Sequence, residues 1–220
     1  MNKRDLIQKT VIFVQNQLNG EGSGHDWWHI YRVWTLAKKI AHAEGANMEI
    51  VELASLLHDI ADRKLNNGDE EAGLKRVEAF LIGNGTDKKT IEDVLHIIET
   101  YSYTAHLKQK KGMDTLEGKV VQDADRLDAI GAIGIARTFN YGGHHSRPLY
   151  DPNLPLSTTV TAKDYTQSSS PTINHFYEKL LHLKGLMNTQ TAKKMATSRH
   201  LFMEQYLKQF YMEWEGKDLV

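Results

Sequence analysis

The 220-residue sequence contains no cysteine. Disulfide bonds and thiolate metal sites are therefore excluded, and any bound metal ion must take its ligands from histidine nitrogen or carboxylate oxygen. Proline is also scarce, and all four prolines lie between residues 141 and 171. This segment, which also contains Gly142-Gly143 and Ser168-Ser169-Ser170, therefore differs in composition from the rest of the chain.

The sequence has little net charge and no long hydrophobic run. Its formal net charge is −1, which gives no general attraction to nucleic acid or to an anionic membrane. No stretch approaches the roughly 18 apolar residues of a membrane span. Near the amino terminus only Val11-Ile12-Phe13-Val14 is apolar, which is too short for a signal peptide. We therefore expect a cytoplasmic protein that does not act mainly on nucleic acid or at a membrane.

The apolar residues recur with helical spacing along most of the chain, and no strand pattern of any length appears. This periodicity predicts an all-α fold. Asp26 is the expected N-cap of the second helix, and Trp27, Trp28 and Trp34 are expected in the core. The predicted helices cover residues 4–19, 26–42, 48–61, 70–83, 88–100 and 116–139, and two blocks within 172–214 that are separated near Asn188.

Segment 141–171 lacks helical periodicity and is much longer than an ordinary connection between helices. Long segments of this kind are either functional or disordered, and we interpret this one as a lid over a cleft. The length of the chain fits one domain over residues 1–220, or one domain with a helical extension.

Histidine and aspartate lie at three places that could form one site. His58 and Asp59 follow an apolar run, His29 lies within the second predicted helix, and Asp125 within the sixth. Two imidazoles and two carboxylates suit a six-coordinate divalent ion and leave about two positions for water or a phosphate oxygen. Such an ion activates water and polarises a phosphoryl group, so the set predicts metal-assisted phosphoester hydrolysis. Neighbouring residues compete for the same roles, namely His25, Asp123 and Asp128.

The order and type of these residues resemble the metal ligands of the HD-domain phosphohydrolase superfamily. The segments that carry the resemblance to a bacterial subfamily of HD hydrolases are residues 24–29, 56–60, 123–131, 176–180, 183–184 and 187–189. The likeness therefore covers nearly the whole chain, and it implies an HD-domain helical bundle with a carboxyl-terminal helical extension. Because the superfamily ligand is the aspartate directly before arginine in Ala-Asp-Arg, the resemblance favours Asp125 over its neighbours.

The resemblance also implies roles near the metal. Asp62 matches the carboxylate that positions or deprotonates the attacking water, and we interpret it as the catalytic residue. Hydrolases of guanosine tetraphosphate have Glu-Asp where this chain has Asp62-Arg63, which argues against that substrate. Arg63 and Lys64 are interpreted as cations that face the phosphate. His96 and Arg147 are further candidates for substrate binding.

At least one member of that subfamily is described as a nucleoside triphosphate pyrophosphatase, and the resemblance implies a similar activity here. The alternatives are a 5′-nucleotidase or phosphodiesterase on the same fold, or a nucleotide-binding HD protein without catalysis. The favoured cofactor is Mn²⁺, with Mg²⁺, Fe²⁺, Co²⁺ and Ni²⁺ as other candidates. The expected partner is a small nucleotide or related phosphate ester, and the sequence leaves the oligomeric state open.

Overall fold

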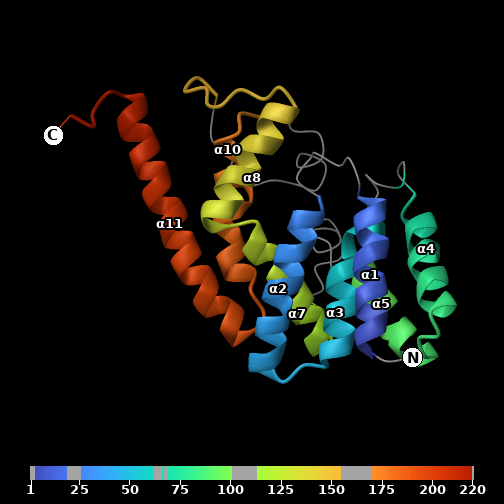
Figure 1. The fold of residues 1–220 in the computed structure, drawn as a ribbon. Helices are drawn as coiled ribbons and strands as arrows, with labels where there is room; N and C mark the ends of the chain where they lie inside the picture. The colour runs from blue at the N-terminus through green and yellow to red at the C-terminus, as the bar shows by residue number, and fades with distance from the viewer. Residues whose placement is uncertain are drawn as a thin grey trace. The chain divides into compact units, whose positions relative to one another are not determined.

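The computed structural model describes residues 3–18, 26–61, 66, 69–100, 113–154 and 170–219. All regular structure within these ranges is helical, which confirms the predicted all-α class (Figure 1). The α-helices are α1 (Lys3–Gln17), α2 (Trp27–Glu44), α3 (Met48–Leu57), α4 (Glu70–Gly83), α5 (Lys88–Thr100), α7 (Leu116–Asp128), α8 (Gly131–His144), α10 (Asn174–Glu178) and α11 (Gln190–Trp214). Two 3-10 helices accompany them, η1 (His58–Ala61) and η2 (Leu180–Leu186).

The chain divides into two compact units, Met1–Asp125 and Arg126–Val220. The first contains α1 to α5, η1 and most of α7, whereas the second contains α8, α10, η2 and α11. Of the predicted lid, residues 155–169 lie outside the described residues, so the lid stays a prediction. Among the described residues, no helix is both long enough and apolar enough to cross a membrane.

Helix α3 is the centre of the first unit. It packs against α1, α2 and α5, while α4 packs against α5 and η1. Every α3 residue from Ile50 to Leu57 except Glu52 is buried, because the sequence is apolar on nearly all sides of the helix. A helix that is enclosed in this way has a fixed position, and it is directly followed by His58 and Asp59.

Helices α2 and α3 form an antiparallel pair, and Figure 1 shows them side by side. Gly45 ends α2 with φ +75°, and the Asn47 side chain caps α3 by accepting a hydrogen bond from the Glu49 N–H. Between the two helices, the Trp34 indole N–H donates to Glu52 Oε1 at 3.0 Å. Because the chain reverses at Gly45, the beginning of α2 lies at the same end of the pair as the end of α3.

The second unit is built around α8 and α11, which pack together, and α11 also packs against η2. The sequence pattern predicted one helix over 116–139, and this prediction is wrong. The structure has α7 and α8 instead, and the new helix begins at Gly131 with φ +77°, a conformation that favours glycine. At this break a Cβ on residue 131 would lie 3.0 Å from Arg199 Cβ and Cγ. Arg199 also donates a hydrogen bond from Nη1 to the carbonyl oxygen of Leu127.

The tryptophans of α2 do not belong to the core as expected. Trp28 is 61% exposed, and Trp27 and Trp34 are partly exposed. The buried stripe of α2 instead contains His29, Ile30, Val33, Ala37, Ile40 and Ala41. Trp28 lies next to this stripe in sequence, but it projects about 100° away from His29 around the helix axis. The apolar character of tryptophan alone therefore gave the wrong assignment.

Candidate metal centre

Three helical segments of the first unit bring the candidate ligands together. His29 lies in the first turn of α2, His58 and Asp59 begin η1 directly after α3, and Asp125 lies near the end of α7. Asp26 caps α2 as predicted, since its Oδ1 accepts a hydrogen bond from the His29 N–H at 2.9 Å. The cap fixes the backbone of His29 at the point where its side chain enters the site.

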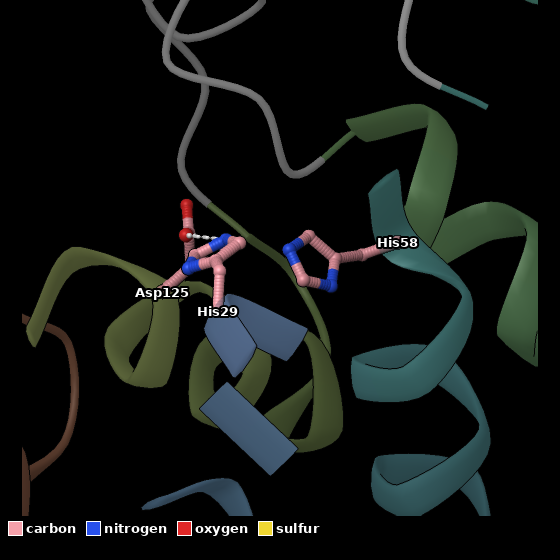
Figure 2. A group of neighbouring side chains, drawn as sticks. All are labelled: His29, His58 and Asp125. Atoms are coloured by element: carbon pink, nitrogen blue, oxygen red, sulfur yellow. Dashed lines mark ion pairs between the residues drawn. The ribbon is translucent and has the colours of Figure 1, made fainter. Parts of the chain in front are cut away.

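The side chains of His29, His58 and Asp125 point toward one another, as Figure 2 shows. One potential ligand atom from each lies within 4.8 Å of the others. His29 Nε2 is 3.4 Å from Asp125 Oδ1 and 3.4 Å from Asp59 Oδ2, and His58 Nε2 is 3.4 Å from Asp59 Oδ1. The Asp59 carboxylate therefore approaches both imidazoles, one with each oxygen atom.

These separations fit a divalent ion better than direct hydrogen bonds. An N–H···O hydrogen bond normally has a donor–acceptor distance of about 2.7–3.2 Å, so 3.4 Å is long for one. With metal–ligand bonds of about 2.1 Å, adjacent ligand atoms lie about 3.0 Å apart around an octahedral ion and about 3.4 Å apart around a tetrahedral one. The described residues therefore fit a small divalent cation with nitrogen and oxygen ligands.

The tautomer of His58 also suits metal binding. Its Nδ1 lies 2.8 Å from the carbonyl oxygen of Ser55, in the last turn of α3. Because a carbonyl oxygen can only accept a hydrogen bond, Nδ1 carries the proton, and in the neutral imidazole Nε2 is then the nitrogen that can act as a ligand. A carbonyl that holds the far nitrogen of a metal-binding imidazole is a common arrangement, and it directs Nε2 toward the other ligands.

Burial differs within the group. The side chains of His29, His58 and Asp59 are at most 2% exposed, whereas that of Asp125 is 34% exposed. Of these four side chains, Asp125 is therefore the one that is most accessible to solvent. A ligand exchanging with water would enter at the side of Asp125.

The neighbours that competed in the sequence have other surroundings. Asp123 is completely buried, and Asp128 forms an ion pair with Arg137 at 3.0 Å. Neither residue belongs to the group of His29, His58 and Asp125; Asp59 is not a member of that group either, but its carboxylate lies 3.4 Å from both imidazoles. His25 lies outside the described residues. Of the three aspartates in this stretch of α7, the geometry thus favours Asp125 as the ligand.

The other predicted site residues are placed only in part. Asp62, Arg63 and Lys64 lie outside the described residues, so their roles stay predictions. His96 Nε2 lies 3.0 Å from Asp114 Oδ1, and this hydrogen bond lowers the pKa of the Asp114 carboxyl group. Arg147 belongs to the second unit, where its guanidinium group lies over the Tyr141 ring. Sequence reasoning missed the Ser55 carbonyl, because a backbone group leaves no signal in residue types.

Known proteins resemble this chain over nearly its whole length. The HD domain family matches residues 27–130, a range that contains all four candidate ligands. A protein of known crystal structure from Lactobacillus plantarum is 35% identical with a TM-score of 0.85, and the match covers 98% of this chain and 100% of that one.

Two further similar crystal structures are informative, one through the description of its protein and the other through its bound ligand. A Bacillus thuringiensis protein described as an HD-superfamily hydrolase is 46% identical with a TM-score of 0.77, over 97% of this chain and 99% of that one. Bacillus subtilis YpgQ, whose structure is a complex with ADP, is 37% identical with a TM-score of 0.78, over the full length of both chains. The fold, the arrangement of histidines and aspartates and these similarities agree, and the chain belongs to the HD domain family.

Proposed function

We propose that this protein is a divalent-metal-dependent phosphohydrolase that acts on nucleotides, with nucleoside triphosphate pyrophosphatase-like activity. The observation that carries the proposal is the convergence of His29, His58 and Asp125 from three helical segments, with the Asp59 carboxylate 3.4 Å from each of the two imidazoles. Buried side chains of these types are expensive to gather unless they hold a cation, because the carboxylate charge is otherwise removed from water.

A nucleotide substrate is supported by the similarity to YpgQ. That protein binds ADP in its crystal structure, and it aligns with this chain over the full length of both. A nucleoside diphosphate offers phosphate oxygens to a metal site, which fits the two open coordination positions expected for four protein ligands. The proposal therefore assigns the phosphate chain of a nucleotide to the solvent-reached side of the site, next to Asp125.

Each residue of the proposed site has a distinct role. His29 and His58 bind through Nε2, and Asp59 and Asp125 supply the negative charge that balances a divalent cation. When bound, such a cation lowers the pKa of water and polarises a phosphoryl group. Asp62 orients or deprotonates the attacking water, and Arg63 and Lys64 offset the charge that grows on the phosphate oxygens. His96 is retained as a candidate substrate contact.

Metal analysis and a nucleotide panel test this proposal together. The purified full chain is analysed for bound metals, stripped with a chelator, and reloaded separately with Mn²⁺, Mg²⁺, Fe²⁺, Co²⁺ or Ni²⁺. Nucleoside mono-, di- and triphosphates are then added, and the products are identified by ³¹P NMR. We expect Mn²⁺ to support release of pyrophosphate from triphosphates, and His58→Ala and Asp59→Ala to lose metal binding and turnover together.

The products also separate the alternatives. Release of inorganic phosphate from monophosphates would indicate a 5′-nucleotidase, and cleavage of a diester would indicate a phosphodiesterase. Nucleotide binding without any turnover would indicate a non-catalytic nucleotide-binding protein. Full activity in either alanine variant would disprove the role of the His58-Asp59 pair.

A further inference from the structure

The short helix η1, which carries His58 and Asp59, is held at its far end by residues that are not candidate ligands. All four residues of η1 are buried, and the helix packs against α4. A 3-10 helix of this length forms few internal hydrogen bonds, and the carbonyl groups at its end have no partner within the helix. The position of η1 therefore depends on contacts that other parts of the chain make with it.

Asn66 makes one of these contacts. Its side-chain Nδ2 donates a hydrogen bond to the carbonyl oxygen of Ile60 at 2.8 Å. The backbone carbonyl oxygen of Asn66 accepts a hydrogen bond at 2.9 Å from the N–H of Asp69, the residue that caps α4. Asn66 is buried, and a hydrogen bond away from water is electrostatically stronger than an exposed one. Asn66 therefore connects the end of η1 to the beginning of α4.

Gly73 allows α4 to approach this junction closely. A Cβ on residue 73 would lie 2.6 Å from Ala61 Cα and 2.7 Å from Asn66 Nδ2. Two carbon atoms that are not bonded to each other normally lie about 3.5–4.0 Å apart, so neither atom leaves room for a methyl group. Ala61 Cα is a backbone atom, and it cannot move aside unless the end of η1 moves with it. The backbone of α4 thus lies directly against η1 because residue 73 has no side chain.

We propose that Asn66 and Gly73 are positioning residues for the candidate metal centre, and that they act by holding η1 and its two ligands in place. The Ile60 carbonyl group that Asn66 binds directly follows Asp59 in the chain. The two oxygen atoms of the Asp59 carboxylate each lie 3.4 Å from an imidazole nitrogen, so a shift of η1 changes both distances. The role at a metal rests on the proposed function, whereas the role in holding η1 does not.

Two matched pairs of variants in the full chain test the inference. Gly73→Ala and Gly83→Ala add the same methyl group to α4. Apart from the chain neighbours of Gly83 and the backbone of α4, however, no described atom lies within 4 Å of a Cβ on residue 83. Asn66→Ala and Asn84→Ala each remove a hydrogen bond of 2.8 Å from an asparagine side chain to a backbone carbonyl oxygen. Asn84 forms this bond with Phe80 at the far end of α4, away from η1.

The first readout is Mn²⁺ binding, followed by electron paramagnetic resonance. The free ion gives the dissociation constant, and the spectrum of the bound ion at saturation reports the geometry of its ligands. Gly73→Ala and Asn66→Ala should each raise the dissociation constant at least about tenfold and change the spectrum of the bound ion, as is typical when a group that orients metal ligands is lost. Gly83→Ala and Asn84→Ala should bind Mn²⁺ as the wild type does.

The second readout is amide hydrogen exchange in the metal-free protein, measured by mass spectrometry over His58–Ala61. Exchange there should be faster in Asn66→Ala than in the wild type or in Asn84→Ala, because only the first variant releases the end of η1. The comparison between the two asparagine variants separates this role from a general loss of stability, since both lose the same kind of hydrogen bond.

The inference is overturned if Asn66→Ala changes neither Mn²⁺ affinity nor exchange more than Asn84→Ala does. Faster exchange in η1 with unchanged Mn²⁺ affinity would also overturn it, because η1 would then move without effect on the ligands. Should Gly73→Ala fail to fold, the asparagine pair decides. Wild-type protein that binds no divalent ion would refute the proposed function, and exchange in η1 would then decide alone whether Asn66 holds this helix.

Discussion

His58 Nδ1 lies 2.8 Å from the carbonyl oxygen of Ser55, one turn earlier in the chain. This contact fixes the His58 tautomer, and it also ties the imidazole to α3, whose residues are almost all buried. The position of the His58 ring is therefore fixed by α3, the central helix of the first unit. His29 gains comparable support from the cap at Asp26, so each imidazole is held by a well-defined helix terminus.

The first prediction concerns the two imidazoles. His29→Gln and His58→Gln should each lower the affinity for Mn²⁺ at least about 100-fold, because an amide is a much weaker ligand than imidazole nitrogen. Affinity is measured by titrating metal-free protein with Mn²⁺ and following the free ion by electron paramagnetic resonance. The control is His42→Gln, which changes an exposed histidine on α2, the helix of His29. Unchanged affinity in either ligand variant would contradict the assignment.

The second prediction separates two aspartates of α7. Asp125→Asn should abolish tight Mn²⁺ binding without lowering the free energy of unfolding of the metal-free protein, because it removes a charge from a crowded group. Asp128→Asn breaks the ion pair with Arg137 and should lower that free energy by about 2–3 kcal/mol. For both variants, the free energy of unfolding is measured by denaturant unfolding and the affinity for Mn²⁺ by titration. The opposite result, in which Asp128→Asn loses Mn²⁺ binding and Asp125→Asn loses stability, would show that Asp128 and not Asp125 is the metal ligand.

The third prediction concerns the break between α7 and α8. Gly131→Ala should lower the free energy of unfolding by about 1–3 kcal/mol, since a side chain at φ +77° is strained and its Cβ would meet Arg199 at 3.0 Å. Gly143→Ala is the control, because Gly143 lies in α8 and, among the described residues beyond the helix's own backbone, no atom lies within 4 Å of the added Cβ. That change should be neutral or slightly stabilising. Equal effects of the two substitutions would show that the break does not depend on glycine.

The same break shows where the sequence was informative and where it was not. The candidate ligands could be found because metal chemistry restricts residue type, and because His58-Asp59 follows an apolar helix. The cap at Asp26 could also be predicted from the sequence, since helix capping depends on neighbouring residues. The end of α7 could not be predicted from the sequence, because Leu127, Ile130 and Ile135 continue the apolar pattern across Gly131. Only the backbone conformation at Gly131 reveals the turn. The lowered pKa of His175 was not predictable either, because it depends mainly on burial and in part on the charge of Arg147, which is distant in sequence.

The last prediction follows from the lowered pKa of His175. Its folded value of about 3 lies below the unfolded value of about 6.5, so the unfolded chain binds more protons between these limits. The free energy of unfolding should therefore fall as pH decreases from 7 to 5, by up to about 2 kcal/mol from this residue. Burial is the main cause of the lowered pKa of His175, and the positive charges of Lys179 and Arg147 add to it. His175→Gln should reduce the pH dependence by that amount in denaturant unfolding at both pH values, whereas His42→Gln, at an exposed position, should leave it unchanged. If His175→Gln retains the full dependence, the imidazole is protonated in the folded protein and another group causes the loss of stability.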